Sequence, residues 1–338
     1  MKAAIVHEPF KMEMIEMEKP ELQSDTDVIV KMKAAGICGS DMHIYHGTNA
    51  VATYPRVLGH EIVGVVDEIG SKVTKVKKGD RVIVDQVINC GECYACKVGR
   101  GNVCHTLKVR GVHVHGGYRE FINVTEKDCY ILPEHLSYED AVMIEPATIA
   151  VQSLSRAQIK KEDTLLILGM GALGSSILRI ARLTGAKIIA ADRHENKLQD
   201  ALKAGADFAV NMTDEAPEKK IREITDGYGP TVSIDAACTK ETLPFLLDIT
   251  GNAGRVITMG FSEELFEIAQ LKITAKELDV RGSRLQNKRF QDVLDLIAEE
   301  KLDLAGSISH TFDFSQIKEA FNFVDSKDPS IRKVVITF

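Results

Sequence analysis

The sequence lacks any apolar run approaching the roughly 18 residues of a transmembrane helix. Its first residues, MKAAIVHEPFKMEM, also lack the apolar core and small-residue cleavage site of a signal peptide. No cluster of basic residues is present and the formal net charge is -7, which disfavours nucleic acid or an anionic membrane as a partner. These absences favour a cytoplasmic location, where stable disulfides are rare.

The length and the strand pattern indicate two domains. A chain of 338 residues exceeds the usual limit for one hydrophobic core. Up to about residue 147 the pattern is mostly of alternating strands, such as DVIVKMKAAG and EIVGVVDEIG. From about residue 164, strands alternate with amphipathic helices, which predicts a parallel, doubly wound sheet.

Cysteine is sparse except in one short segment. Four of the seven cysteines lie in NCGECYACKVGRGNVC with the spacing C-x2-C-x2-C-x7-C. In a reducing compartment such thiolates converge on one ion, and the longer loop brings the fourth ligand to a tetrahedral zinc site. An iron–sulfur cluster and unligated surface thiols are the alternatives, although the ferredoxin run continues x3-C-P and this one does not. The predicted ligands of a structural zinc are Cys90, Cys93, Cys96 and Cys104.

A glycine-rich loop follows a short buried strand. TLLILG leads into GMGALG, which places Gly169, Gly171 and Gly174 in G-x-G-x-x-G order before an amphipathic helix that Gly185 closes. The first glycine turns the chain, the second lets a pyrophosphate approach the backbone, and the third permits close helix–strand packing. The helix N-terminus then offers N–H groups to phosphates, so we predict a dinucleotide site.

The choice between NAD and NADP depends on the end of the next strand. Asp192 ends AKIIAAD, 23 residues after Gly169, where a carboxylate binds the adenosine ribose and repels a 2′-phosphate. Arg193 argues the other way, because an adjacent arginine accommodates the phosphate in some sites. Asp192 could also cap the helix HENKLQDAL. We interpret it as a ribose ligand because of its βαβ context, and therefore favour NAD.

A second set of metal-ligating residue types is spread along the chain. GICGSDMHIYHG contains Cys38, YPRVLGHEIVG contains His60 and Glu61, and VMIEPATIA contains Glu145. Taken singly, a buried cysteine is usually a packing residue and a His-Glu pair usually lies on the surface. Only the set as a whole points to a metal site.

These motifs, together with the four-cysteine segment and the dinucleotide loop, resemble the zinc-dependent medium-chain dehydrogenases from end to end. That family contains alcohol, sorbitol and threonine dehydrogenases. Within it, ICGSDMHIYHG, NVCHTLKVRGVHVHGGYREF, GSRLQNKRF and HTFDF are most similar to the bacterial sugar-acid branch. The resemblance implies a zinc-containing, NAD-dependent oxidoreductase that acts on CH-OH donors.

The resemblance also implies an α/β fold with two domains. We expect a GroES-like, β-rich catalytic domain with the structural zinc lobe at residues 1–148, and a Rossmann NAD-binding domain at residues 149–285. Residues 286–338 are expected to return to the catalytic domain. By resemblance alone, the protein is expected to be a homodimer or homotetramer.

The catalytic zinc ligands of the family match Cys38, His60 and Glu61. Glu145 matches a carboxylate that, in polyol dehydrogenases, binds this zinc directly or through its water, and the sequence leaves the two cases open. Asp41 matches a carboxylate that orients the histidine ligand. Zinc lowers the pKa of bound water from about 15.7 to about 7 and acts comparably on an alcohol, so a hydride can leave to the nicotinamide.

Proton removal is expected to use a hydroxyl and a histidine. Ser40 and His43 resemble the relay of the family, and histidine titrates in a range that suits the last transfer. His43 could also be an ordinary surface histidine. The predicted NAD-binding residues are Gly169, Gly171, Leu173, Gly174, Asp192, Arg193, Lys197, Met259, Gly260, Phe261 and Ser283.

The sugar-acid resemblance implies a hexonate oxidised at C5. L-gulonate, giving D-fructuronate, is our first choice; L-galactonate follows, then sorbitol or another polyol, and threonine. A carboxylated substrate needs a cationic partner, and arginine suits a carboxylate best. Arg284 is the candidate, with Arg110 and His113 as weaker ones, although Arg284 could form an ordinary ion pair.

Two other functions fit the same fold. A zinc-less quinone or enoyl reductase lacks the catalytic ligand set that this sequence carries. A non-enzymatic regulator, possible because fold does not fix function, is expected to lose ligands or gain a basic face. Neither change is seen in the sequence.

Overall fold

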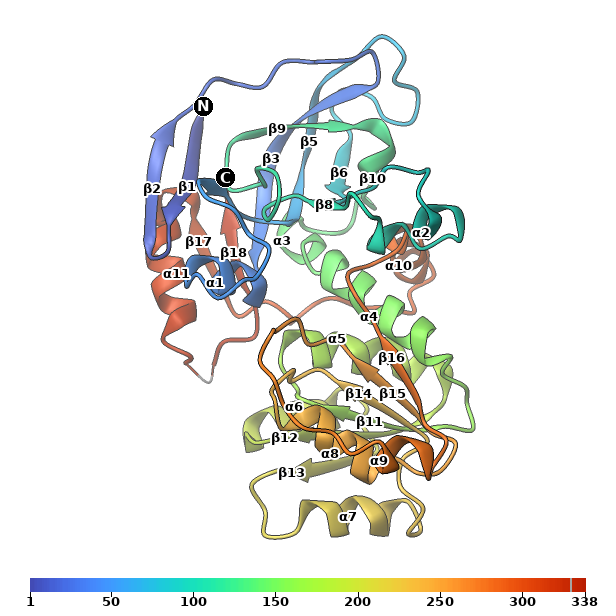
Figure 1. The fold of residues 1–338 in the computed structure, drawn as a ribbon. Coiled ribbons are helices and arrows are strands. Elements are labelled where there is room, and N and C mark those ends of the chain that lie inside the picture. Colours follow the sequence, from blue (N-terminus) through green and yellow to red (C-terminus); the bar gives the residue numbers. More distant parts are fainter. Residues whose placement is uncertain (329) are drawn as a thin grey trace. The chain divides into compact units, whose positions relative to one another are not determined.

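The computed structural model describes residues 1–328 and 330–338 (Figure 1). It divides the chain into a first unit, Met1–Glu145 with Phe290–Phe338, and a second unit, Pro146–Arg289. The predicted α/β fold class is confirmed, because the first unit is rich in antiparallel strands and the second has a parallel sheet with helices. No helix in the described part of the chain is long and apolar enough to cross a membrane.

The first unit is built on a seven-stranded sheet in the order β10-β6-β5-β3-β18-β17, with β9 also paired to β3. A three-stranded sheet β2-β1-β4 and a two-stranded sheet β7-β8 accompany it. The strands are β1 Lys2–Glu8, β2 Lys11–Glu16, β3 Asp27–Ile37, β4 Arg56–Val57, β5 Glu61–Ile69, β6 Arg81–Val84, β7 Val87–Ile88, β8 Lys108–Val109, β9 Phe121–Thr125, β10 Cys129–Ile131, β17 His310–Asp313 and β18 Val334–Thr337. The helices are α1 Gly39–Tyr45, α2 Tyr94–Lys97, α3 Tyr138–Ala141, α10 Phe290–Ala298 and α11 Ile317–Asp325.

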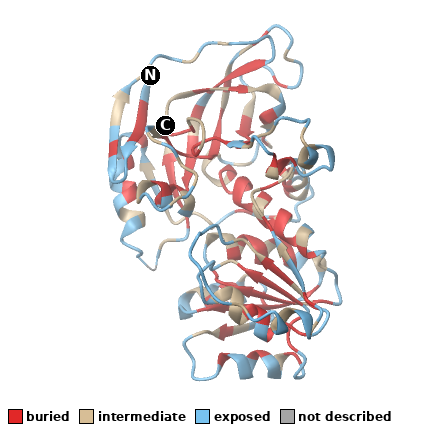
Figure 2. Ribbon diagram, in the orientation of Figure 1, coloured by how far each residue is buried: buried red, intermediate tan, exposed pale blue. Residues whose placement is uncertain are grey.

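The C-terminal segment completes this sheet. β18 pairs antiparallel with β3, in a register that runs from Val334 opposite Ile37 to Thr337 opposite Ala34. β17 pairs parallel with β18 on its other side. The strands at the centre, β3 and β5, are buried along most of their length (Figure 2). A strand covered on both faces reads as a nearly continuous apolar run, as DVIVKMKAAGI does.

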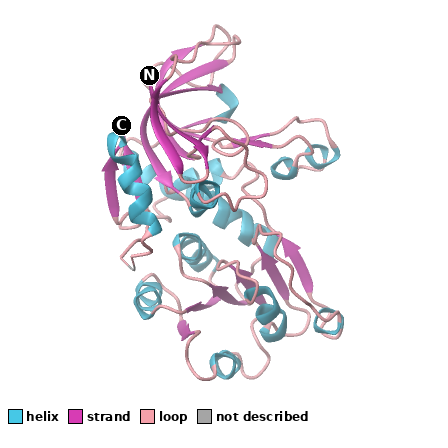
Figure 3. Ribbon diagram, turned by 60° about the vertical axis from the view of Figure 1, so that its left-hand side comes forward, coloured by secondary structure: helices cyan, strands magenta, loops and turns pink. Residues whose placement is uncertain are grey.

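The second unit is a parallel sheet in the order β13-β12-β11-β14-β15-β16. This is the 3-2-1-4-5-6 order of a Rossmann domain. Figure 3 shows its strands with helices packed around them. The strands are β11 Thr164–Leu168, β12 Lys187–Asp192, β13 Phe208–Asn211, β14 Val232–Asp235, β15 Arg255–Thr258 and β16 Asp279–Gly282. The helices are α4 Ile144–Ala157, whose first two residues belong to the first unit, α5 Ala172–Ala181, α6 Glu195–Lys203, α7 Pro217–Ile224, α8 Thr242–Ile249 and α9 Leu271–Thr274.

The helix after the glycine loop forms as its sequence pattern predicts. α5 buries Ile177, Leu178, Ile180 and Ala181 against the sheet. A short 3-10 turn follows, and Gly185 ends it with φ of 77°, a left-handed conformation that glycine adopts without steric cost.

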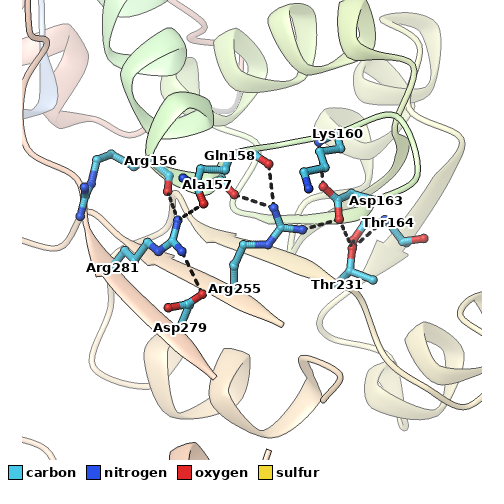
Figure 4. Close-up of polar contacts among 10 residues, drawn as sticks. All are labelled: Arg156, Ala157, Gln158, Lys160, Asp163, Thr164, Thr231, Arg255, Asp279 and Arg281. Atoms are coloured by element: carbon cyan, nitrogen blue, oxygen red, sulfur yellow. Dashed lines mark hydrogen bonds and ion pairs between the residues drawn. The ribbon is translucent and has the colours of Figure 1, made fainter. Parts of the chain in front are cut away.

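Two arginines on neighbouring strands cap the C-terminus of α4 (Figure 4). Arg255 donates to the carbonyls of Ala157 and Gln158 at 2.8 and 2.7 Å and pairs with the buried carboxylate of Asp163. Arg281 donates to the Arg156 carbonyl at 3.0 Å. The last carbonyls of a helix have no intrahelical donor and carry partial negative charge, so guanidinium groups there satisfy both needs.

We expect Arg255→Met to lower the free energy of unfolding by roughly 3 kcal/mol, because it leaves the buried Asp163 carboxylate without its cation. The matched control is Arg281→Met, whose partner Asp279 is 59% exposed, and it should cost about 1 kcal/mol or less. Urea unfolding midpoints of the full chain measure both. Equal losses in the two variants would show that burial of the pair makes no difference.

Candidate active site, structural metal centre and cofactor pocket

Three metal-ligating side chains converge in the first unit. Cys38 follows the end of β3, and His60 and Glu61 lie at the start of β5. One ligand atom from each of the three lies within 4.8 Å of the others. The antiparallel register sets Gly36 opposite Glu61, and a side chain on Gly36 would overlap the Glu61 carboxylate. The fold therefore brings together a thiol, an imidazole and a carboxylate, which is a donor set that fits zinc.

Asp41 orients the histidine of this group. Its Oδ1 lies 3.4 Å from His60 Nδ1, and the carboxylate also accepts the backbone N–H of Cys38 at 2.9 Å and that of Gly59 at 3.3 Å. The hydroxyl of Tyr118 donates to it at 3.0 Å. An acceptor on Nδ1 fixes the tautomer of a histidine and leaves Nε2 for a metal.

Several buried ionisable groups act on one another around the three metal-ligating side chains. Burial by itself lowers the pKa of His60, but the carboxylate of Asp41 and the thiol of Cys38 raise it well above its ordinary value. Burial raises the pKa of Glu145 to about 8, and the nearby charge of Glu61 adds to the rise. Anionic groups that raise the pKa values of their neighbours in this way favour the binding of a cation.

Glu61 has a partner that the sequence did not reveal. The ammonium of Lys333, just before β18, is 4% exposed and pairs with both carboxylate oxygens of Glu61. Burial lowers the pKa of Lys333, but the charges of Glu61, Cys38 and Glu145 and the hydrogen bond to Glu61 together raise it above its usual value. No local spacing could have found this pair, because its members are 272 residues apart. Glu61 as a zinc ligand stays a prediction, and binding would compete with Lys333.

Glu145 stands in electrostatic contact with His60 and Glu61 but is not one of the three convergent ligands. It lies in the first turn of α4 and is 3% exposed. The amide of Gln86, a second residue that the sequence analysis missed, donates to its Oε1.

Ser40 and His43 lie on one face of α1, three residues apart. The hydroxyl of Ser40 is 3.4 Å from His60 Nε2. His43 is exposed, and its Nδ1 is 3.0 Å from the hydroxyl of Thr48. Ser40 thus lies next to the metal-ligand group and His43 at the surface of the first unit, and their role as a proton relay stays a prediction.

The four clustered cysteines form a second group with tetrahedral dimensions. Four of their sulfur–sulfur distances lie between 3.4 Å, for Cys104 and Cys90, and 4.0 Å, for Cys90 and Cys96, and all four sulfurs are within 4.8 Å of one another. Four sulfurs about 2.3 Å from one zinc would stand about 3.8 Å apart. Backbone N–H groups point at these sulfurs, as from Cys93 to Cys90 Sγ at 3.4 Å, and lower the pKa of the Cys90 thiol. The group fits a single zinc ion, and all seven cysteines are free of disulfides.

The second unit has a pocket of about 480 Å³ at the carboxyl ends of its strands. The loop before it has the geometry of a dinucleotide site. Gly169 has φ of 100°, a side chain on Gly174 would overlap the Gly169 carbonyl, and open space surrounds the missing side chain of Gly171. The predicted residues that line the pocket are Gly169, Gly171, Asp192, Arg193 and Lys197.

Asp192 lies at the wall of this pocket. Its Oδ2 accepts the Met170 N–H at 2.7 Å, and its Oδ1 accepts the His194 N–H at 3.0 Å. Burial raises the pKa of Asp192, but these donors outweigh it and keep the pKa below its usual value. Glu241, which the sequence analysis missed, also lines the pocket and interacts with the charge of Arg193. Asp192, Glu241 and Arg193 thus all line this pocket.

The other predicted cofactor residues follow the last strands of the sheet, except Leu173, which is in the first turn of α5. Met259, Gly260 and Phe261 come directly after β15, and Ser283 after β16. The Ser283 hydroxyl is buried, and no described residue is its hydrogen-bond partner. A buried hydroxyl without a partner at the carboxyl edge of such a sheet fits contact with a ligand.

The three candidate substrate residues differ in their surroundings. Arg284 is partly buried, with its guanidinium 4.7 Å from the ring centre of Phe261, and burial lowers its pKa. Arg110 is 5% exposed and forms a buried ion pair with Asp128 at 2.8 Å. His113 Nδ1 accepts a backbone N–H at 3.1 Å. Of the two arginines, Arg110 is thus committed to a structural pair.

Comparison with known proteins agrees with this geometry. The family profile described as "Alcohol dehydrogenase GroES-like domain" matches residues 24–134, and "Zinc-binding dehydrogenase" matches residues 172–299. Starvation-sensing protein RspB of Escherichia coli (strain K12) is 39% identical over 340 residues, with 100% of this chain and 99% of the relative covered. L-galactonate-5-dehydrogenase of the same organism is 28% identical over 343 residues, with 100% and 99% covered. A crystal structure described as short chain alcohol dehydrogenase (rspB) from E. coli CFT073, complexed with cofactor NADH, has a TM-score of 0.94 at 39% identity, covering 100% of this chain and 99% of that chain.

We expect Cys90→Ser to reduce the zinc content from two ions per chain to one. Apparent zinc-binding energies of about 10–16 kcal/mol mean that the lobe should unfold, with a lower melting temperature. NAD binding should persist, because the dinucleotide pocket lies in the second unit. Cys238→Ser, a single cysteine outside both clusters, is the control for zinc content. Unchanged metal content in Cys90→Ser would remove the structural zinc from this segment.

We expect Asp192→Ala to raise the affinity for NADP relative to NAD by roughly 10-fold or more, because a 2′-phosphate would no longer meet a buried charge. Equilibrium dissociation constants for both nucleotides, measured by fluorescence on the full chain, test this without turnover. If the unmodified protein already binds NADP as tightly as NAD, Arg193 dominates over the two carboxylates of the pocket.

Proposed function

Since the chain belongs to the zinc-binding dehydrogenase family with a GroES-like alcohol dehydrogenase domain, we propose that it oxidises a secondary alcohol of a sugar acid with NAD. The family makes it an oxidoreductase of CH-OH donors. L-gulonate oxidised at C5 to D-fructuronate is the substrate that we propose first, with L-galactonate second. A relative at 28% identity is an L-galactonate-5-dehydrogenase, which supports a hexonate.

The observation that carries the proposal is the convergence of Cys38, His60 and Glu61 within 4.8 Å, beside the buried carboxylate of Glu145. When bound there, zinc would supply the Lewis acidity that lowers the pKa of the substrate alcohol. The dinucleotide pocket supports NAD as the hydride acceptor, because its loop leaves space for a pyrophosphate at Gly171.

The side chains of the protein would then orient the metal ligand His60 and remove the proton of the substrate alcohol. Asp41 lies 3.4 Å from His60 Nδ1 and would favour the proton on that nitrogen, which would leave Nε2 to hold a metal. Ser40 would accept the alcohol proton and pass it by way of a ribose hydroxyl of bound NAD to His43, which is exposed and can release it to water. When bound, NAD would supply the acceptor for the hydride of the same carbon, so the alcohol would become a ketone while its hydroxyl proton leaves through Ser40 and His43.

Arg284 is the residue that we propose for the substrate carboxylate. Its guanidinium is partly buried over Phe261, and burial already disfavours its charge. A carboxylate pairing with such a group would gain more than it would with a fully hydrated arginine, because less water screens the pair. As a partner for the substrate carboxylate, Arg110 is a weaker candidate than the sequence suggested, because its guanidinium already forms a buried ion pair with Asp128.

We expect a substrate panel with NAD to show faster oxidation of L-gulonate and L-galactonate than of sorbitol or L-threonine. In Arg284→Leu, kcat/KM on the hexonates should fall roughly 100-fold, which corresponds to loss of a desolvated charge pair, while sorbitol changes little. Arg222→Leu, an exposed arginine on α7, is the matched control and should leave both unchanged.

Cys38→Ser should remove turnover and leave NAD binding intact. If sorbitol or threonine were oxidised faster than every hexonate, the sugar-acid proposal would be wrong and the neutral polyol reading would replace it.

A further inference from the structure

Gln86 is buried and tightly held beside the metal-ligand group. It lies between β6 and β7, and its side chain has no exposed surface. The backbone carbonyl of Gln86 accepts the backbone N–H of Arg110 at 3.0 Å. On either side of it, the Asp85 carboxylate accepts the Val87 backbone N–H at 2.8 Å. The Arg110 guanidinium also donates to the backbone carbonyl of Asp85 at 2.8 Å. The backbone N–H of Asp85 donates to the backbone carbonyl of Asp128 at 2.8 Å. The backbone is anchored on both sides of Gln86, so its side chain has a fixed origin.

The two ends of the Gln86 amide have different surroundings. Its Nε2 donates to Oε1 of the buried Glu145, and a carboxylate oxygen must face the nitrogen end of an amide. The amide Oε1 therefore faces away from Glu145. It is buried, and no described residue donates to it. Leaving a buried acceptor unpaired costs about 1–3 kcal/mol, so a donor from outside the chain is favoured here.

The position of this acceptor relates it to the substrate. Glu145, on which the Gln86 amide rests, interacts electrostatically with His60 and Glu61. Under the proposed function, the carbinol that is oxidised sits on that ligand group. A sugar acid carries a hydroxyl on the carbon next to this carbinol, and such a hydroxyl is a donor that a simple secondary alcohol lacks.

We propose that Gln86 Oε1 accepts a hydrogen bond from the substrate hydroxyl next to the carbinol that is oxidised, and so selects vicinal diols over simple secondary alcohols. The inference rests on the proposed function and extends it to the arrangement of the substrate hydroxyls. A site built to bind a substrate hydroxyl discriminates against the analogue without it, because the acceptor of the site is then left unpaired.

The test compares butane-2,3-diol with butan-2-ol on the zinc-loaded enzyme at saturating NAD. The unmodified protein should prefer the diol by roughly 100-fold in kcat/KM. Gln86→Met keeps the side-chain length and removes the acceptor. It should lower kcat/KM for the diol by roughly 30-fold while changing butan-2-ol less than about threefold. Gln152→Met, a buried glutamine of the second unit, is the matched control and should keep the ratio.

The outcomes separate three roles. Equal losses on both alcohols would show that Gln86 only positions Glu145, and unchanged rates on both would show that water satisfies Oε1; either result overturns the proposal. Zinc content and melting temperature of Gln86→Met must match the unmodified protein for this comparison. The dissociation constants of both alcohols, measured on the enzyme with NADH, give the same ratio without turnover. Failure of the hexonates in the panel would reject the sugar-acid substrate and leave the diol comparison intact.

Discussion

The geometry of the metal-ligand group depends on the hydrogen bonds that the buried carboxylate of Asp41 accepts. It accepts the N–H groups of Cys38 and Gly59 and the hydroxyl of Tyr118, and it faces the ring of His60. These partners come from three separate segments of the chain. A carboxylate without exposed surface requires several donors in place of its water, and here those donors adjoin the ligands themselves. Burying Asp41 thus fixes the distance between two ligand segments.

Charge balance is the second constraint on this region. Asp41, Glu61 and Glu145 are all buried, and the ammonium of Lys333 compensates only part of their charge. Burial, together with the charges of Glu61 and Asp85, raises the pKa of Glu145 to about 8, although the charges of His60 and Lys333 act against the rise. Several buried carboxylates around one thiol and one imidazole are costly without a cation, and a divalent ion compensates them. The same charges that destabilise the apo site therefore give it affinity for a metal.

The sequence predicted those structural features that depend on residues close together in the chain. The glycine loop, the end of α5 at Gly185 and the four cysteines are each set by residues within about twenty positions, and local geometry leaves them few alternatives. The pairs Gln86–Glu145 and Glu61–Lys333 join residues that are 59 and 272 positions apart. Glu145 and Glu61 lie in recognisable motifs, but nothing in the sequence around Gln86 or Lys333 marks them as their partners. Arg110 shows the same limit, because a buried pair with Asp128 and a free cationic side chain look alike in sequence.

The way in which the C-terminal residues complete the first unit has a consequence for biosynthesis. β18 and Lys333 belong to that unit, yet all of residues 146–289 are made before them. The second unit is continuous in sequence, so it can fold on the emerging chain as soon as Arg289 has left the ribosome. The first unit must wait with residues 34–37 of β3 without their β18 partner and the Glu61 carboxylate without its ammonium partner. During the seconds in which residues 290–338 are made, the nascent chain therefore has an open sheet edge in its first unit, whereas all residues of its second unit are already present.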